Sequence, residues 1–209
     1  MTAAVAGLLL AAGAGRRYGM PKALAVFDGR LLVERAAALL RDGGCDPVVV
    51  VLGAQADEVQ HRADLTGCVV IVNEGWDSGM ASSLQTGLAT VEGMPVDAVT
   101  VLLVDTPGMT AAAIARVVAS AGTDPAASLV SASYDGVPGH PVLLGRSHWA
   151  GVAAGATGDS GARAYLEANA DRVVTVPCED IADGSDLDHP QHTMDLCLPR
   201  AQTSRIENI

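Results

Sequence analysis

The sequence predicts an α/β protein in which a mostly parallel sheet lies between two layers of helices. Short runs of apolar residues alternate with amphipathic stretches along the chain, an order typical of right-handed βαβ units. Of the 209 residues, 49% are hydrophobic, 23 are Gly and one is Phe. The core is therefore expected to consist of Ala, Val and Leu in closely packed helices and strands, as suits a parallel sheet buried on both faces.

The first half of the chain contains five expected elements. Residues 5–10 form an apolar run that leads directly into a glycine-rich loop, and we expect the first strand there. A crossover helix is expected over residues 31–41, because apolar side chains recur at helical spacing before a Gly-Gly stop. The unbroken apolar run at residues 48–52 predicts a buried second strand. A short polar helix over residues 55–62 then leads to a third strand at residues 68–72.

The second half continues the alternation of strands and helices. The expected elements are, in order, a helix from about residue 80, a strand at 99–104, a helix at 110–121, strands at 128–132 and 140–144, a helix around Trp149, a helix at 162–168 and a strand at 173–176. The turn between the two strands within residues 128–144 suggests a hairpin-like excursion over the site. A single domain is expected over residues 1–198, and residues 199–209 are expected to be a flexible tail because they show no core pattern.

Charge and hydropathy argue against several classes of partner. The 24 acidic and 13 basic residues give a net charge of −11. This argues against a nucleic acid or an anionic membrane, because binding to both depends on neutralising phosphate charge. The apolar stretch at residues 5–14 follows no basic segment and is too short to span a bilayer. No targeting signal is visible, and we expect the protein in the cytoplasm.

The loop that follows the first expected strand indicates a nucleotide ligand. It combines three glycines with three cations, namely Gly13, Gly15, Gly19, Arg16, Arg17 and Lys22. A buried strand that leads into such a loop brings backbone N–H groups and fixed cations up to phosphates. The pattern matches neither the G-x-x-x-x-G-K-[ST] loop nor the G-x-G-x-x-G fingerprint. A tight strand-to-helix turn with solvated charges is the alternative interpretation.

The loop sequence L-A-A-G-x-G-x-R-Y-G-x-P-K at residues 10–22 resembles the signature of the MobA-like nucleotidyltransferases, which include the molybdenum-cofactor cytidylyl- and guanylyltransferases. The resemblance implies a Rossmann-like α/β/α nucleotidyltransferase fold in which Arg17 and Lys22 contact the triphosphate. The motif G-M-x-x-S-L-x-x-G-L at residues 79–88 is similar to the family element that brings a helix N-terminus and a serine beside the nucleotide; a plain helix cap is the alternative. The implied nucleotide-binding residues are Leu10, Ala11, Ala12, Gly13, Gly15, Arg17, Lys22 and Ser83.

Two acidic motifs imply a magnesium site. The motif D-x-P at residues 105–107 directly follows an expected strand and resembles the family's metal-binding motif, where a carboxylate meets Mg²⁺ and substrate phosphates. Residues 186–190 resemble the family's D-I-D-T-P motif, with His in place of the threonine. We expect Asp105 and Asp188 to share one Mg²⁺, with Asp186 as the substitute ligand. Capping of the following helix is the alternative role for Asp105.

Two further motifs imply contacts with a second substrate. The G-H-P motif at residues 139–141 resembles a family element that lines the site, and it contains His140. The G-D-x-G-A-R motif at residues 158–163 supplies Asp159 and Arg163, whose forked guanidinium suits an anion. Each has a structural alternative, since a His before Pro is commonly structural and Asp159 can cap the helix that follows.

The motifs occur in the family's order and resemble the MocA-type branch, the cytidylyltransferases. The resemblance implies transfer of CMP from CTP to the terminal phosphate of molybdopterin with release of pyrophosphate, with Lys22, Arg17 and Asp105 as catalytic residues. Ala12 stands where the guanylyl branch has glycine, and the resemblance implies that this position faces the base, so its methyl group would narrow the base pocket and favour CTP over GTP. A molybdoenzyme or its maturation chaperone is the expected protein partner.

Three alternatives remain at this stage. The first is a guanylyltransferase, and the second is a sugar- or alcohol-phosphate nucleotidyltransferase of the same fold. The third is a non-catalytic chaperone that hands molybdopterin to an oxidoreductase and binds without turnover.

Overall fold

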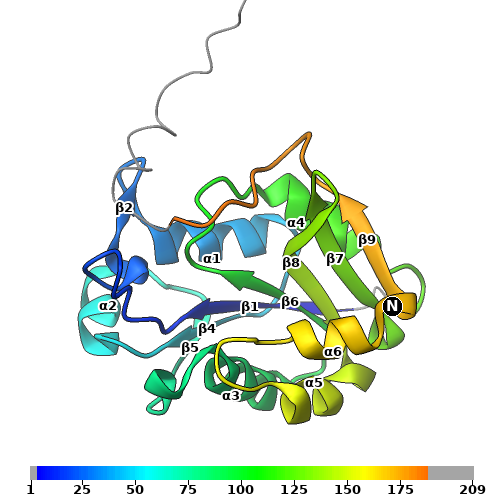
Figure 1. Cartoon of the computed structure of the whole chain (residues 1–209). Helices are drawn as coiled ribbons and strands as arrows, with labels where there is room; N and C mark the ends of the chain where they lie inside the picture. Colours follow the sequence, from blue (N-terminus) through cyan, green and yellow to red (C-terminus); the bar gives the residue numbers. More distant parts are fainter. Residues whose placement is uncertain (1–3, 188–209) are drawn as a thin grey trace, which may run out of the picture.

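In the computed structural model, which describes residues 4–187, a seven-stranded sheet lies between two layers of helices (Figure 1). Across the sheet the strands are β5 (Cys68–Val72), β4 (Val48–Leu52), β1 (Val5–Ala11), β6 (Ala98–Leu103), β8 (Val137–Gly145), β7 (Leu129–Tyr134) and β9 (Val173–Pro177). The helices are α1 (Leu32–Asp42), α2 (Ala56–Arg62), α3 (Met80–Glu92), α4 (Ala111–Ala119), α5 (Trp149–Gly155) and α6 (Arg163–Ala168). A separate hairpin consists of β2 (Val26–Phe27) and β3 (Arg30–Leu31). Single 3-10 turns lie at Lys22–Leu24, Trp76–Ser78, Pro125–Ala127, Arg146–His148 and Ala170–Arg172.

The sheet is mostly parallel, as the sequence predicts. β1 pairs in parallel with β4 on one side and β6 on the other, and Leu8 lies opposite both Val49 and Val101. Of the strands described in this sheet, β8 alone runs against its neighbours, β6 and β7. The Rossmann-like three-layer fold expected for the family is therefore confirmed.

The β7–β8 hairpin differs from the sequence-based expectation of an excursion over the site. It is built into the sheet, where Leu144 of β8 lies opposite Val99 of β6. Leu143 and Leu144 are fully buried, so this part of β8 is covered on both faces by apolar neighbours. Burial on both faces favours a place between two strands over a place above the sheet.

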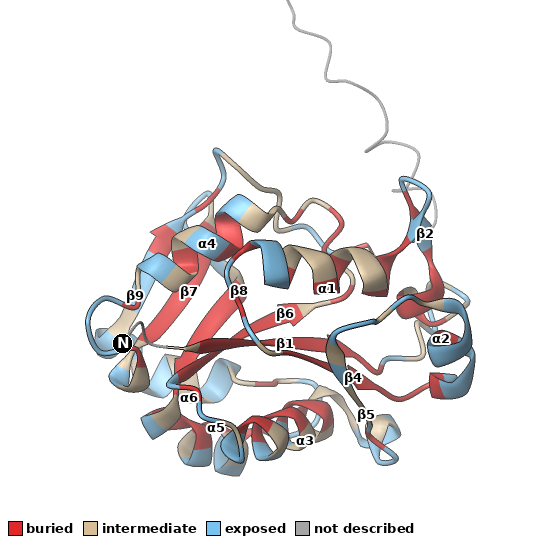
Figure 2. Cartoon of the chain, turned by 180° about the vertical axis from the view of Figure 1, so that it is seen from behind, coloured by how far each residue is buried: buried red, intermediate tan, exposed pale blue. Residues whose placement is uncertain are grey.

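The core consists of two apolar layers separated by the sheet, and Figure 2 shows the central strands and the inward helix faces as buried. Successive residues of β1 contribute to opposite layers, because side chains alternate along a strand. Leu9 and Ala11 pack in the layer with α1 and α4, whereas Leu8 and Leu10 pack in the layer with α3 and α5. β1 is buried along its whole length and ends at the glycine-rich loop.

Residues at the ends of the helices explain where they begin and stop. Gly43 follows α1 directly, as the Gly-Gly stop predicts. Thr110 caps α4, because its Oγ1 accepts a hydrogen bond from the Ala113 N–H at 3.2 Å. This cap leaves Asp105, five residues earlier, available for another role. Every helix within residues 4–187 is too short or too polar to span a lipid bilayer.

Gly87 allows α3 to lie close to β1, and its replacement tests this packing. A methyl group at Gly87 would overlap the side chain of Leu8, which is fully buried and has little room to move. We predict that Gly87→Ala lowers the free energy of unfolding by about 1–3 kcal/mol, as overpacking does, despite the helix propensity that Ala adds. Equilibrium urea unfolding measures the change.

Gly93 provides the matched control at the end of the same helix. Its φ is −76°, and the nearest atom to an added Cβ is 3.9 Å away. Gly93→Ala should therefore change the free energy of unfolding by less than about 0.5 kcal/mol. Equal stability of the two variants would contradict the close packing of α3 on β1.

Candidate functional site

A cleft of about 390 Å³ opens at the carboxyl ends of β1 and β6. After β1 the chain adds β4 and then β5 on one side of β1, and then crosses to β6 on the other side. The cleft thus lies at a point where the strand order reverses, the usual ligand site of an open parallel sheet. Its lining residues come from four segments and are Leu10, Ala12, Gly13, Ala14, Gly15, Arg16, Arg17, Tyr18, Lys22, Trp76, Asp77, Gly79, Met80, Ser83, Leu103, Val104, Asp105 and Asp159.

Two glycines of the loop after β1 have different structural roles. Gly15 has a φ of +58°, and a Cβ at this position would overlap the carbonyl of Met20. Its own carbonyl accepts a hydrogen bond from the Gly19 N–H at 2.8 Å, which closes the loop on itself. Gly13 has no positive φ, and no atom lies within 4 Å of an added Cβ. The packing of the protein itself therefore does not require a glycine at residue 13, where the loop presents bare backbone to the cleft.

An ion pair joins this loop to the loop after β6. Lys22 Nζ donates a hydrogen bond to Asp105 Oδ2 at 2.7 Å, and the two side chains are 16% and 21% exposed. A hydrogen bond from the Val104 N–H to the Leu10 carbonyl at 3.2 Å joins the same two strand ends. Arg17 lines the cleft and is exposed. The Asp105 carboxylate therefore lies at the carboxyl edge of the central strands beside the cations of the loop, since Arg16 also lines the cleft.

The first turn of α3 brings hydroxyl groups to the cleft. Ser83 lines the cleft and is buried, and Asn73 Nδ2 donates hydrogen bonds to Ser83 Oγ at 3.0 Å and to Ser82 Oγ at 2.8 Å. Asn73 is itself buried, and its Oδ1 accepts a hydrogen bond from the Gly75 N–H at 3.0 Å. Sequence reasoning missed Asn73, although a polar residue directly after a buried strand was a signal for it.

Asp159 caps α3, not the nearby helix α6 as the structural alternative supposed. Its Oδ1 accepts a hydrogen bond from the Met80 N–H at 3.2 Å, and the Gly158 carbonyl accepts one from the Ala81 N–H at 2.8 Å. These acceptors satisfy two N–H groups that the first turn of a helix leaves without a helical partner. Asp159 also lines the cleft, so the G-D-x-G-A-R motif contributes to the same site as α3.

A wall of the cleft forms where the loops after β1, β4 and β5 meet. A Cβ on Gly53 would lie 2.6 Å from Trp76 Cβ and 2.8 Å from Ala12 Cβ, so these three residues are tightly packed. Ala12 is 5% exposed, and Trp76 presents a flat aromatic side chain at the cleft. Sequence reasoning singled out Ala12 and missed Trp76, although a Trp three residues after Asn73 in a chain of two Trp was a signal for it.

Of the other expected site residues, Ala11, His140 and Arg163 are not among those that line the cleft. Ala11 is buried against the α1 layer. The pKa of His140 is lowered to about 4, chiefly by burial; the negative charge of Asp105 opposes this shift and the positive charge of Arg163 adds to it. The imidazole is therefore neutral near pH 7, and it is close enough to both groups to sense their charges.

Of the two acidic residues expected to join Asp105 at the metal site, the structure describes only Asp186. The Leu187 N–H donates a hydrogen bond to the Asp105 carbonyl at 2.8 Å, so the segment that contains Asp186 runs beside the loop of Asp105. Asp188 lies outside the described residues. Within residues 4–187, no group of three His, Cys, Asp or Glu side chains is arranged to hold a metal ion.

Comparison with known proteins shows which family the chain resembles along most of its length. The family model described as "MobA-like NTP transferase domain" matches residues 7–173. Nicotine blue oxidoreductase of Paenarthrobacter nicotinovorans is 39% identical over 189 residues, which cover 88% of this chain and 92% of that protein. A probable molybdenum cofactor guanylyltransferase of Opitutus terrae is 31% identical over 109 residues, which cover 52% of each chain.

Solved structures agree with this result. The Mycobacterium tuberculosis protein Rv0371c is 28% identical, with a TM-score of 0.78 over 94% of this chain and 98% of that one. A complex of Rv0371c with manganese is 25% identical, with a TM-score of 0.69 over 83% of this chain and 88% of that one.

The two glycines of the loop allow ligand contact to be separated from stability. We predict that Gly13→Ala leaves the melting temperature within about 2 °C of the natural protein, because open space surrounds the new methyl group. If the loop contacts a nucleotide, a methyl group there should nevertheless weaken nucleotide binding about 10- to 200-fold, with CTP as the probe. Thermal melting and calorimetric titration measure the two effects.

Gly15→Ala is the contrasting variant. It combines a positive φ with a collision at the Met20 carbonyl, so the melting temperature should fall by at least several degrees. Unchanged affinity for CTP in Gly13→Ala would mean that the loop does not contact the nucleotide.

Proposed function

The chain belongs to the MobA-like NTP transferase family, and on this premise we propose that it is a Mg²⁺-dependent cytidylyltransferase acting on molybdopterin. It would transfer CMP from CTP to the terminal phosphate of the cofactor. The observation that supports this most strongly is the bare Gly13 backbone beside Arg17 and the Lys22–Asp105 pair, at the reversal point of the sheet. This arrangement offers N–H groups, cations and one carboxylate to a metal-bound triphosphate.

The cations of the loop would neutralise the triphosphate. Lys22 and Arg17 line the cleft next to the exposed Gly13. The net charge of −11 makes such local cations necessary, because the protein as a whole repels an anion. In this proposal Lys22 exchanges its contact with Asp105 for a phosphate oxygen when the nucleotide binds.

Asp105 fits the role of a magnesium ligand. Its carboxylate lies in the cleft, is partly exposed, and already accepts a cationic group, the Lys22 ammonium, at 2.7 Å. We propose that Asp105 holds the ion together with Asp188, or with Asp186, whose neighbour Leu187 is hydrogen-bonded to the Asp105 carbonyl. When bound, Mg²⁺ supplies positive charge to the phosphate oxygens.

The reaction requires no protein nucleophile. An oxygen of the acceptor's terminal phosphate forms a bond to the α-phosphorus of CTP, and the bond from that phosphorus to the α,β-bridging oxygen breaks. The bonding electron pair leaves with pyrophosphate. The residues of the cleft would therefore act by positioning and by stabilising charge. Asp159, in the lining of the cleft, would contact the acceptor, and neutral His140 and Arg163, outside that lining, would do so where the acceptor extends beyond it. A molybdoenzyme or its maturation chaperone would receive the product.

One relative favours a second candidate function. Nicotine blue oxidoreductase matches 88% of this chain, and its name describes a redox enzyme, not a transferase. The same cleft would then hold a nucleotide that donates electrons to a dye-like substrate. Guanylyl transfer also stays open, since a relative is named a probable molybdenum cofactor guanylyltransferase.

A panel of reactions separates these functions. The purified protein is incubated with Mg²⁺ and each nucleoside triphosphate, with and without molybdopterin, and released pyrophosphate is measured. A parallel series measures reduction of nicotine blue with NADH or NADPH. The proposal expects pyrophosphate only when CTP and molybdopterin are both present. Dye reduction without pyrophosphate release would replace the proposed transfer with the second candidate function. Tight binding of molybdopterin without either activity would favour a delivery chaperone. Pyrophosphate release with a sugar or alcohol phosphate in place of molybdopterin would indicate a different acceptor.

Replacement of Lys22 tests its role in charge stabilisation. Lys22→Ala should lower kcat about 100- to 1000-fold, as the loss of one electrostatic stabiliser does. Lys22→Arg should also be poor, because a forked guanidinium does not replace a compact ammonium in a tight loop. Steady-state kinetics under saturating CTP measure both, and near-normal turnover of Lys22→Ala would contradict the assignment.

Ala12 is expected to set the preference for a pyrimidine base. Its methyl group packs with Gly53 and Trp76 in the wall of the cleft, so Ala12→Gly removes bulk from that wall. The variant should raise kcat/KM for GTP relative to CTP by about 10- to 200-fold, the usual effect of one methyl-sized difference. Ala11→Gly is the matched control, because Ala11 faces the other layer of the core. A natural preference for GTP, or no gain in GTP use by Ala12→Gly, would remove this explanation of base selection.

A further inference from the structure

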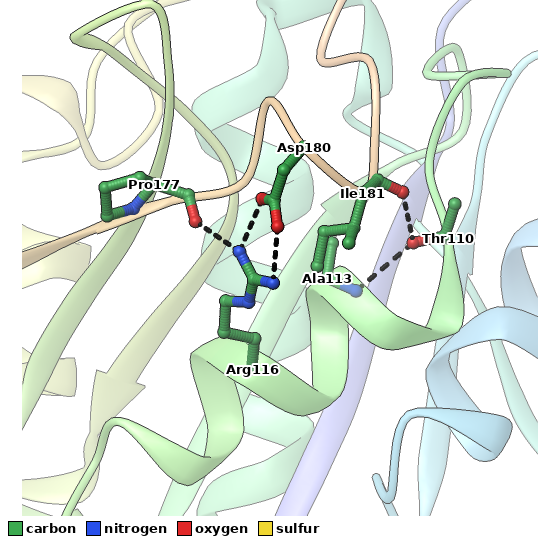
Figure 3. Close-up of polar contacts among 6 residues, drawn as sticks. All are labelled: Thr110, Ala113, Arg116, Pro177, Asp180 and Ile181. Carbon is green, nitrogen blue, oxygen red and sulfur yellow. Dashed lines mark hydrogen bonds and ion pairs between the residues drawn. The ribbon is translucent and has the colours of Figure 1, made fainter.

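The segment after β9 follows a defined path toward the cleft. This segment, residues 177–187, is called the strap below. Arg116 of α4 holds its beginning: Nη1 donates to the Pro177 carbonyl at 2.8 Å, and the guanidinium pairs with both oxygens of Asp180 at 2.6 and 2.9 Å (Figure 3). At the N-cap of α4, six residues before Arg116, Thr110 Oγ1 donates to the Ile181 carbonyl at 3.1 Å (Figure 3).

Two backbone hydrogen bonds continue the path to Asp105. The Asp183 N–H donates to the Gly108 carbonyl at 3.1 Å, and the Leu187 N–H donates to the Asp105 carbonyl at 2.8 Å. Gly108 makes this approach possible, because a Cβ there would lie 2.6 Å from Asp183 Cβ. From residue 177 to residue 187 of the strap, the hydrogen-bond partners have decreasing residue numbers, from 116 to 105.

The strap is also packed into the protein near its end. Leu187 is 1% exposed and belongs to the core layer with α1 and α4. Gly184 lies against the ring of Tyr134, where a Cβ would overlap it. The strap therefore has one register along the β6–α4 connection, and this register places Asp186 next to the residue bonded to Asp105.

The Arg116–Asp180 ion pair fixes the position of the strap more than it stabilises the fold. The two side chains are 36% and 60% exposed, and an ion pair so accessible to water is usually worth little. Its geometry is nevertheless specific, because a guanidinium fork contacts both carboxylate oxygens and a backbone carbonyl at once. A lysine ammonium is a point charge and cannot reproduce this fork.

We propose that Arg116 is a positioning residue that sets the register of the strap and thereby the position of Asp186 beside the loop of Asp105. This inference rests on the proposed function only in taking Asp105 as a metal ligand. Arg116 does not line the cleft, so it acts through the strap and touches no substrate.

The first measurement is hydrogen exchange of the strap amides, which needs no activity. In Arg116→Ala and in Asp180→Asn, exchange of the Asp183 and Leu187 amides should be at least tenfold faster than in the natural protein. Arg62→Ala is the matched control, because Arg62 forms an exposed ion pair with Glu58 within α2 at 3.6 Å and takes no part in the hydrogen bonds that hold the strap. Arg62→Ala should leave the exchange rates of these two amides unchanged. Unchanged exchange in Arg116→Ala overturns the proposal.

The second measurement is affinity for a divalent ion, with Mn²⁺ as the probe in the presence of CTP. Arg116→Ala should weaken Mn²⁺ binding at least fivefold, Arg116→Lys should recover only part of this loss, and Arg62→Ala should have no effect. Faster exchange with unchanged Mn²⁺ affinity would show a purely structural role and overturn the proposal. These results stand whether or not the protein releases pyrophosphate, so failure of the proposed transfer reaction is detected separately.

Discussion

The ion pair between Lys22 and Asp105 joins the two loops on which the site depends. One loop follows β1 and the other follows β6, and the parallel pairing of these strands brings both loops to one edge of the sheet. The ammonium and the carboxylate are 2.7 Å apart and both line the cleft. A cation and a carboxylate held in this way suit a ligand that is itself an anion bound to a metal, because each group can exchange its partner for one of opposite charge in that ligand.

The remaining walls of the cleft come from residues far apart in the sequence. Asp159 caps α3 across 79 positions, and Asn73 fixes the hydroxyls of the same helix turn. The strap runs from α4 to Asp105 on the other face of the sheet from α3, where Leu187 packs in the layer of α1 and α4. Helix ends, strand ends and the strap thus converge where the strand order reverses, and the chain needs no separate binding domain for this cleft within residues 4–187.

The local pattern of apolar and polar residues was sufficient to predict most helices and strands. It does not predict contacts between residues that are far apart in the sequence. The strands at residues 48–52 and 68–72 have the predicted bounds, because unbroken apolar runs between turn residues have few alternatives. The place of β8 within the sheet depends on its pairing with β6, about 40 residues away, and its local sequence suits a surface hairpin equally well. The capping of α3 by Asp159 and the wall formed by Ala12, Gly53 and Trp76 were missed for the same reason.

The most direct test of this account is the affinity of Asp105→Asn for CTP, measured by calorimetry in Mg²⁺ and again in EDTA. If Asp105 is a metal ligand beside the triphosphate, the change should weaken CTP binding at least tenfold in Mg²⁺. In EDTA the same change removes a negative charge that repels the nucleotide, so CTP should bind as tightly as to the natural protein or more tightly. An equal loss of affinity under both conditions, or no change under either, would contradict the account.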